Sequence, residues 1–79
     1  MNAIDLAHTV AETLSKDGTA PSGMTYSVID GVLKVKMDLE DTNLKNLVKL
    51  DEGVQQAMEL GFNAGPLVVR IDMNKLKGE

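Results

Sequence analysis

The sequence predicts an α+β domain, a two-layer α/β sandwich in which helices pack on one face of a three-stranded sheet in the order α-β-β-α(-α)-β. Three observations predict this class. Apolar residues recur at helical spacing over residues 3–14, an Asp30-Gly31 pair separates two alternating runs, and residues 67–73 alternate again. A chain of 79 residues has room for one domain, so we assign residues 1–79 to a single small unit.

The first predicted helix covers residues 3–14, where one side of the helical wheel is apolar and the other is polar. Asn2 is the expected N-cap, and Gly18 stands where a left-handed glycine would end the helix. Residues 17–23 are small and polar, so we expect a surface loop before the first strand.

The Asp30-Gly31 pair favours a type I′ turn between two strands. A two-residue turn pairs Ile29 with Val32 and Tyr26 with Val35, and residues paired across two strands share a face. Turn register and apolar pattern therefore agree on one inner face, which we expect to lie against the helices. That face holds Met24, Tyr26, Val28, Leu33, Val35, Met37 and Leu39, and the outer face holds Thr25, Ser27, Lys34 and Lys36.

Residues 41–61 are expected to be helical, with a break near Leu50 and with Gly61 as the C-cap. The break is expected because the apolar residues form two stripes that point in different directions. The first stripe holds Leu44, Leu47 and Val48, and the second holds Leu50, Val54, Ala57 and Met58. A continuous helix would place Asp51 on its apolar side, whereas a break makes Asp51 the N-cap of a second helix.

Residues 67–73 predict the third strand, an edge strand beside the first or the second. Val69 and Ile71 would face the helices, while Val68 and Arg70 would face outward. A right-handed crossover is required only if this strand runs parallel to the second.

Composition excludes several classes of function. The chain has no cysteine, which excludes disulfides, thiolate metal sites and a cysteine nucleophile. A net charge of −4 and an outer face without aromatic side chains argue against nucleic acid as a partner. We find no secretory signal and no apolar run of membrane-spanning length, so we expect a cytoplasmic protein with no membrane partner.

The two aromatic residues, Tyr26 and Phe62, leave the core to aliphatic side chains, which bury less area each. A weaker core of this kind favours a homodimer over an isolated monomer. Phe62 is expected to pack back on the core beside a helix end, with a contact role as the alternative.

Two sets of outer-face residues are candidate binding sites. Lys34, Lys36 and Arg70 are candidates for an anion-binding strip, with a simply solvated face as the alternative. Ile29, Val32 and Val68, on the same side, are expected to form a small apolar patch suited to a partner or a second copy.

Candidates for catalysis or metal binding are few. His8, the one histidine, falls on the polar side of the first helix, and a lone histidine does not make a zinc site. The acidic residues at 38–41 lack the spacing of a calcium loop, and the glycines match no phosphate-binding motif. We therefore predict no catalytic residue, no metal and no cofactor.

The leading interpretation is a small non-enzymatic module that acts through protein–protein contacts as a homodimer, of accessory or inhibitor type. Its edge strands would be available for pairing. The first alternative is a binder of a small anionic ligand through Lys34, Lys36 and Arg70. The second alternative is a small enzyme that uses Asp51 or His8.

Overall fold

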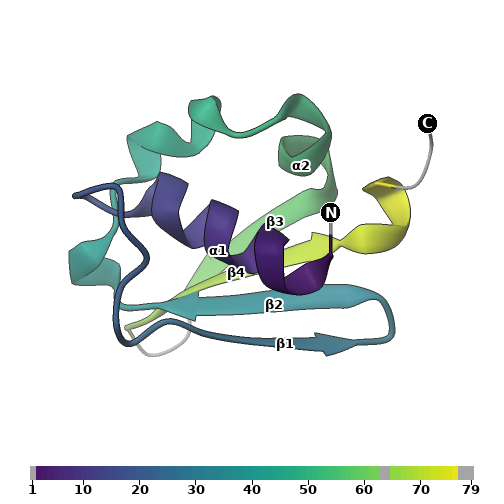
Figure 1. Cartoon of the computed structure of the whole chain (residues 1–79), viewed down its shortest axis with the longest axis horizontal. Coiled ribbons are helices and arrows are strands. Elements are labelled where there is room, and N and C mark those ends of the chain that lie inside the picture. Colours follow the sequence, from purple (N-terminus) through teal and green to yellow (C-terminus); the bar gives the residue numbers. More distant parts are fainter. Residues whose placement is uncertain (1, 63–64, 77–79) are drawn as a thin grey trace.

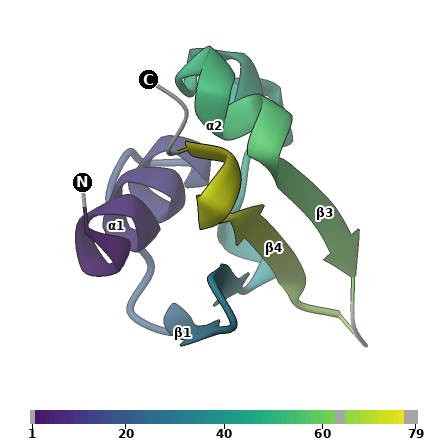
Figure 2. The same ribbon diagram turned by 90° about the vertical axis from the view of Figure 1, so that its right-hand side faces the viewer.

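A computed structural model of the chain describes residues 2–62 and 65–76 (Figure 1). It contains a four-stranded antiparallel sheet, and Figure 2 shows the helices together on one side of that sheet. The predicted α+β class, with helices on one face, is therefore confirmed. With η for a 3₁₀ helix, the elements in chain order are α1 (Ala3–Leu14), β1 (Thr25–Ile29), β2 (Val32–Met37), η1 (Leu39–Asp41), η2 (Leu44–Lys49), α2 (Glu52–Ala57), β3 (Met58–Phe62), β4 (Leu67–Asp72) and η3 (Met73–Leu76).

The sheet has the strand order β1-β2-β4-β3, and each neighbouring pair is antiparallel. The prediction of three strands was wrong because residues assigned to a helix form the additional strand β3. β4 was expected at an edge, but it lies between β2 and β3. The edges of the sheet are therefore β1 and β3.

The β1–β2 hairpin has the predicted turn and register. Asp30 and Gly31 have φ angles of 55° and 79°. Both central residues of a type I′ turn require such positive values, which few residue types other than glycine, asparagine and aspartate adopt readily. Ile29 pairs with Val32, and the other pairs follow in the predicted register.

The helices cover β2 but not β1. Leu33, Val35 and Met37 of β2 are buried, because α1 packs on this strand. Tyr26 and Val28 of β1 face the same side but are 41% and 44% exposed. The expectation that both strands lie beneath the helices is therefore wrong for β1, which extends beyond the helical layer.

The core lies between the helices and the inner faces of β2 and β4, and it is aliphatic, as the composition predicted. Its buried members are Leu6, Ala7, Val10, Ala11, Leu14, Leu33, Val35, Met37, Leu50, Val54, Ala57, Leu67, Val69 and Ile71. Neither aromatic residue belongs to this set, since Phe62 is 61% exposed and Tyr26 is also exposed. Both aromatic side chains are therefore available at the surface.

The ends of α1 are defined by hydrogen bonds. Asn2 is the N-cap as predicted, and its side chain accepts the N–H of Asp5 at 2.9 Å. Beyond the other end, the N–H of Asn43 donates to the carbonyl of Leu14 at 2.7 Å, which ties the helix to the segment after η1. Gly18 has a positive φ of 81°, but it lies in the loop and does not cap the helix.

The predicted break near Leu50 is confirmed. Leu50 has extended backbone angles between η2 and α2. Asp51 caps α2, because its side chain accepts the N–H of Gly53 at 3.0 Å. α2 itself has only six residues, so it covers a short stretch of the sheet.

The 3₁₀ helix η2 replaces the α-helix that was expected before the break, and a short 3₁₀ helix, η1, precedes it. In a 3₁₀ helix, residues three apart share a side. Leu44 and Leu47 therefore point in similar directions, and Leu47 packs against the core, while Val48 turns outward and is 77% exposed. Leu39 was expected to extend β2, but it lies in η1 and is 41% exposed.

Residues 58–62 form β3 where the end of a helix was predicted. Met58 leaves the helical conformation with φ −111° and ψ 154°. Gly61, the expected C-cap, pairs instead with Val68 of β4. Apolar and other residues alternate through this segment, but the helical spacing that ends at Met58 concealed this strand pattern.

Candidate functional site

The outer face of the sheet carries the three predicted cationic residues. Lys34 and Arg70 are direct cross-strand partners on β2 and β4, and Lys36 lies two residues along β2. The row through Lys34 and Arg70 continues to Ser27 on β1 and to Glu59 on β3. The three cations therefore share one face, as predicted. The cross-strand row that contains Lys34 and Arg70 ends at the carboxylate of Glu59.

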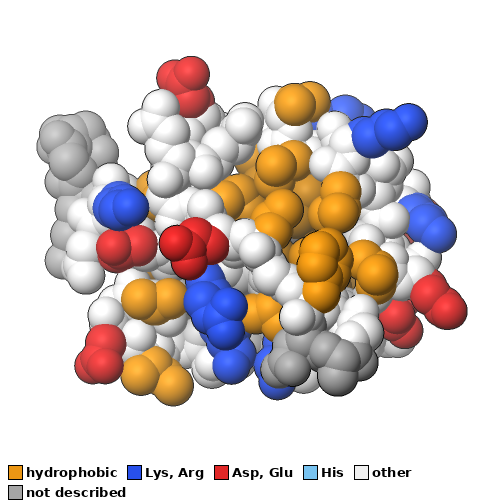
Figure 3. Space-filling view, turned by 180° about the vertical axis from the view of Figure 1, so that it is seen from behind, with side chains coloured by type: hydrophobic (Ala, Val, Ile, Leu, Met, Phe, Trp, Pro, Cys, Tyr) orange, Lys and Arg blue, Asp and Glu red, His pale blue; other side chains and the backbone are white. Residues whose placement is uncertain are grey.

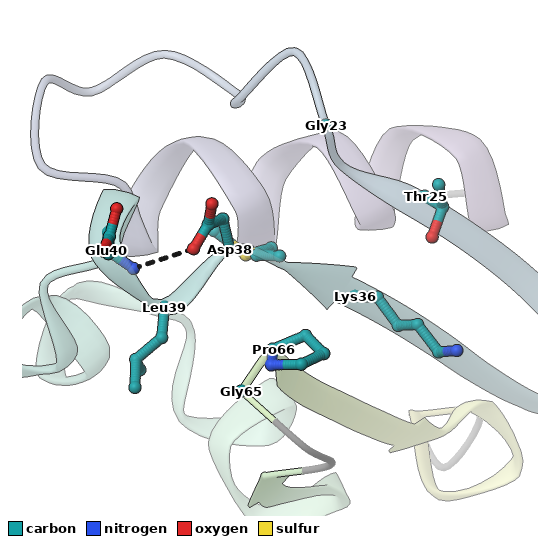
Figure 4. A pocket seen from close by; sticks show the side chains of 9 residues that line it. Gly23, Thr25, Lys36, Asp38, Leu39, Glu40, Gly65 and Pro66 are labelled. Carbon is teal, nitrogen blue, oxygen red and sulfur yellow. Dashed lines mark hydrogen bonds between the residues drawn. The ribbon is translucent and has the colours of Figure 1, made fainter.

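Lys36 lines an open hollow of about 700 Å³ (Figure 4). The same hollow contains the carboxylates of Asp38 and Glu40. Figure 4 shows the Lys36 side chain running along the sheet away from both carboxylates, while Asp38 accepts the backbone N–H of Glu40 at 3.2 Å. The charged groups of this hollow therefore do not converge on one point where a small anion would bind.

Arg70 belongs to a second hollow, of about 380 Å³, which also contains Glu59 and Asp72. The guanidinium lies over β3, since a Cβ added at Gly61 would be 3.8 Å from its Nη1 atom. Glu59 is also the cross-strand partner of Arg70. Arg70 therefore stands among carboxylates and not in a uniformly positive pocket.

Ile29 and Val32 are direct cross-strand partners, as the predicted patch requires, but Val68 does not join them. Ile29 lies in the row that contains Val32, whereas Val68 lies in the row that contains Lys36, with the Lys34 row between them. Ile29 is 68% exposed, but Val68 is only 2% exposed. Only Ile29 of the two therefore offers side-chain surface to a partner.

The two residues considered for catalysis lie on different elements. His8 is exposed on α1, and Asp51 is exposed at the start of α2, where its side chain serves as a cap. Among the residues that the structure describes, no hydrogen bond joins them and no group of three His, Cys, Asp or Glu side chains could hold a metal ion. Nothing in this arrangement pairs a base with a nucleophile.

Exposed apolar side chains gather on a different part of the molecule, which we call the η2–β3 surface. Figure 3 shows hydrophobic side chains concentrated there, on the side of β3 and the 3₁₀ segments. Their exposed fractions run from 36% for Leu44 to 77% for Val48. A concentration of this kind on a small protein marks an interaction site more often than scattered apolar residues do. We use this name for the exposed large apolar side chains of η1, η2 and β3, which are Leu39, Leu44, Val48, Leu60 and Phe62.

Two members of the η2–β3 surface are exposed because β3 extends beyond the helical cover. Leu60 and Phe62 face the helical side of the sheet, since they pair with the buried residues Val69 and Leu67. The short helix α2 packs on β4, the neighbouring strand. β3 is therefore a sheet edge whose apolar side chains are only partly covered.

Basic residues accompany the apolar ones in η2. Lys45 directly follows Leu44, and Lys49 directly follows Val48, and all four side chains are exposed. η2 contains no acidic residue, although the whole chain has a net charge of −4. Asp38 and Glu40 flank Leu39, and Glu59 precedes Leu60, so the basic character belongs to the η2 part of the surface. An acidic segment of a partner would therefore complement η2.

Sequence reasoning missed most of this surface. Phe62 was expected to pack back on the core, with contact as the alternative, but it is 61% exposed. Val48 was placed in a buried helical stripe, and the 3₁₀ geometry turns it outward. The alternation through residues 58–62 was the signal that would have placed Leu60 and Phe62 on one face of a strand.

Comparison with protein-family models, curated proteins and solved structures finds no match for this chain. Within residues 2–62 and 65–76, no helix has the length and apolar character needed to cross a membrane.

Proposed function

We propose that the chain is a non-enzymatic interaction module that acts through protein–protein contacts, with the η2–β3 surface as its recognition site. The observation that carries the proposal is the exposure of Phe62 and Val48, at 61% and 77%, beside three further exposed leucines. Burying large apolar side chains in a partner is favourable at roughly 25 cal/mol for each Å² removed from water. Aromatic side chains are also enriched among the residues that dominate binding energy at interfaces.

The partner we propose is an acidic segment with apolar side chains. Leu60 and Phe62 lie on the edge strand β3, which has a free side for an added strand. Lys45 and Lys49 would face the acidic residues of such a segment. In this arrangement the apolar contacts provide the affinity, and the lysines provide specificity for an acidic partner.

The anion-binding alternative has less support, because Lys36 and Arg70 each share a hollow with carboxylates. An anionic ligand at the strip would meet this negative charge as well as the cations. The enzymatic alternative also has less support, because Asp51 is engaged as a helix cap and His8 stands on another element.

Selection of binders from a displayed library of short random peptides tests the proposal directly. Peptides would be selected on the unaltered chain after depletion on the Phe62→Ser variant, whose side chain is exposed enough for the fold to tolerate the change. We expect the selected peptides to be rich in apolar and acidic residues. Their binding should shift the amide NMR signals of η2 and β3.

The matched control is Val28→Ser, which alters an exposed apolar side chain on the opposite sheet edge, β1. We expect it to keep the affinity of the selected peptides, whereas Phe62→Ser should lower that affinity at least tenfold. Selected peptides that are basic, or that bind both variants equally, would overturn the proposal. Binding to vesicles of anionic lipid with no peptide preference would overturn it too.

A further inference from the structure

β1 is an open sheet edge. Its sequence lacks the features that usually prevent an edge strand from pairing with another chain. Its five residues, Thr25–Ile29, are all exposed, and none is charged or a proline. Edge strands of monomeric proteins are commonly protected by lysine, proline, a bulge or a covering loop. The other edge, β3, carries Glu59 and Gly61, which are both poor strand formers. β1 therefore has an uncharged, glycine-free edge that suits pairing with a second copy of itself.

The hairpin turn defines which backbone groups of β1 are free. In a two-residue hairpin the residues that flank the turn, Ile29 and Val32, exchange hydrogen bonds with each other. Hydrogen-bonded and non-hydrogen-bonded pairs then alternate along an antiparallel ladder. Ser27 therefore directs its backbone groups toward β2, while Tyr26 and Val28 direct theirs toward the open edge.

We propose that two copies of the chain pair through β1, antiparallel and centred on Ser27. In this register Tyr26 lies opposite the partner's Val28, and Val28 lies opposite the partner's Tyr26. The free N–H and C=O groups of both residues are then all used, and the two four-stranded sheets become one continuous sheet. This pairing uses a different site from the proposed recognition surface, since β1 and β3 are the opposite edges of the sheet.

The side chains of β1 are complementary to themselves in this register. Tyr26 and Val28 share the helical side of the sheet and are 41% and 44% exposed. Aromatic side chains opposite β-branched ones form favourable cross-strand pairs, and the two-fold axis produces this pair twice. On the outer side Thr25 meets the partner's Ile29, and Ile29 itself is 68% exposed in the single chain.

The two helical layers fit together in this arrangement. A two-fold axis perpendicular to the sheet places the helical layers of both copies on the same face of the combined sheet. The two β2 strands are then three strand spacings apart, about 14 Å. Because α1 packs on β2, the two α1 helices are separated by more than the roughly 8–10 Å of directly packed helices. This space accommodates the Tyr26 and Val28 side chains of both copies.

The net charge of each copy and the small area of the β1–β1 interface predict the affinity of the dimer. β1 has no charged side chain, so the net charge of −4 on each copy is carried elsewhere. Added salt screens the repulsion between two such copies, so we expect it to strengthen the dimer. One strand pair with its neighbouring side chains is smaller than a standard interface of roughly 800 Å² per partner. We therefore expect a dimer whose population depends on protein concentration.

Cysteine cross-linking tests the register, because the natural chain has no cysteine. In the Ser27→Cys variant the two new thiols face each other across a non-hydrogen-bonded pair, where Cα atoms are about 4.5 Å apart. That separation suits a disulfide. In the Thr25→Cys control the two thiols are four residues apart along the strands, about 13 Å. We expect mild oxidation to give a covalent dimer for Ser27→Cys and at least tenfold less for Thr25→Cys.

Sedimentation of the cysteine-free chain over a range of concentrations is the second measurement. We expect a monomer–dimer equilibrium that Val28→Lys shifts at least tenfold toward monomer, since a charged edge strand resists pairing. Val48→Lys, on the η2–β3 surface, is the matched control and should leave the equilibrium unchanged. The proposal is overturned if the unaltered chain is monomeric at millimolar concentration, if both cysteine variants cross-link equally, or if only Val48→Lys abolishes the dimer.

Discussion

The carboxylate of Asp51 accepts the backbone N–H of Gly53 at 3.0 Å, and the carbonyl of Asp51 accepts the N–H of Gln55 at 2.9 Å. Asp51 thus begins α2 directly after Leu50, the residue that ends η2. Without the side-chain acceptor, the N–H of Gly53 would have no partner within the first turn of the helix.

Asp51→Ala should therefore destabilise the chain by about 1 kcal/mol, the usual cost of removing an N-cap acceptor. Asp51→Asn, which keeps an acceptor oxygen, should cost much less. Urea unfolding followed by circular dichroism measures both values. A gain in stability for Asp51→Ala would mean that the side chain does not cap α2.

The turn glycine Gly31 should be more sensitive than a glycine in the loop. Its φ of 79° is costly for other residues, and an added Cβ would lie 2.8 Å from Nδ2 of Asn74. Gly31→Ala should cost at least about 1–2 kcal/mol in the free energy of unfolding. Gly23→Ala is the matched control, since nothing lies within 4 Å of its added Cβ.

In Gly31→Ala combined with Asn74→Ala, the close contact is removed but the unfavourable φ remains. The double variant should therefore recover only part of the lost stability. Equal unfolding free energies for Gly31→Ala and Gly23→Ala would contradict the type I′ turn.

Local signals in the sequence correctly placed the hairpin turn and two helix N-caps, although the C-caps expected at Gly18 and Gly61 were wrong. The Asp30-Gly31 turn, the Asn2 cap and the Asp51 cap each rest on residues within four positions of one another. Such features are determined by backbone conformation and a nearby hydrogen bond. They appear in the structure where the sequence predicted them.

β3 was missed because it depends on a distant strand. Met58 satisfies both the helical spacing that begins at Val54 and the alternation that continues to Phe62. Pairing with β4 decides between the two, and that contact lies outside any local window. The same error made β4 an edge strand in the prediction, because its second neighbour was absent.

The candidate site was predicted in part for a related reason. The shared face of Lys34, Lys36 and Arg70 follows from hairpin register and strand alternation, and it was correctly predicted. The exposure of Val48 and Phe62 depends on a 3₁₀ helix and on the short length of α2. Neither property has a strong signature in the sequence.

Asp17 should titrate at a lower pH than an ordinary aspartate. The backbone N–H of Thr19 donates to its Oδ1 at 3.0 Å, and the Thr19 hydroxyl donates at 2.8 Å. These two hydrogen bonds lower the pKa of Asp17 below its ordinary value of 3.8. Carboxyl carbon NMR shifts followed against pH measure it, and Thr19→Ala should raise the pKa part of the way.

The sign of the accompanying stability change follows from this lowered pKa. A depressed folded-state pKa adds stability that is complete above the unfolded value and is lost as the pH falls through the folded value. Asp17 is fully exposed, so solvent screens the interaction. We therefore expect only a small decrease in the free energy of unfolding as the pH falls below the ordinary aspartate pKa of 3.8. An Asp17 pKa at or above 3.8 would contradict the hydrogen-bonded loop.

Gly61 distinguishes the observed strand from the helix end that its sequence context suggested. It pairs with Val68 in β3 without a positive φ, and an added Cβ would meet Nη1 of Arg70 at 3.8 Å, an ordinary contact. Gly61→Thr should therefore stabilise the chain by roughly 0.5–1 kcal/mol, because threonine favours strands and glycine weakens them. At a helix C-cap with left-handed backbone the same change would destabilise. Thermal and urea unfolding measure the difference, and a loss of stability comparable to that of Gly31→Ala would show that residues 58–62 are not a strand.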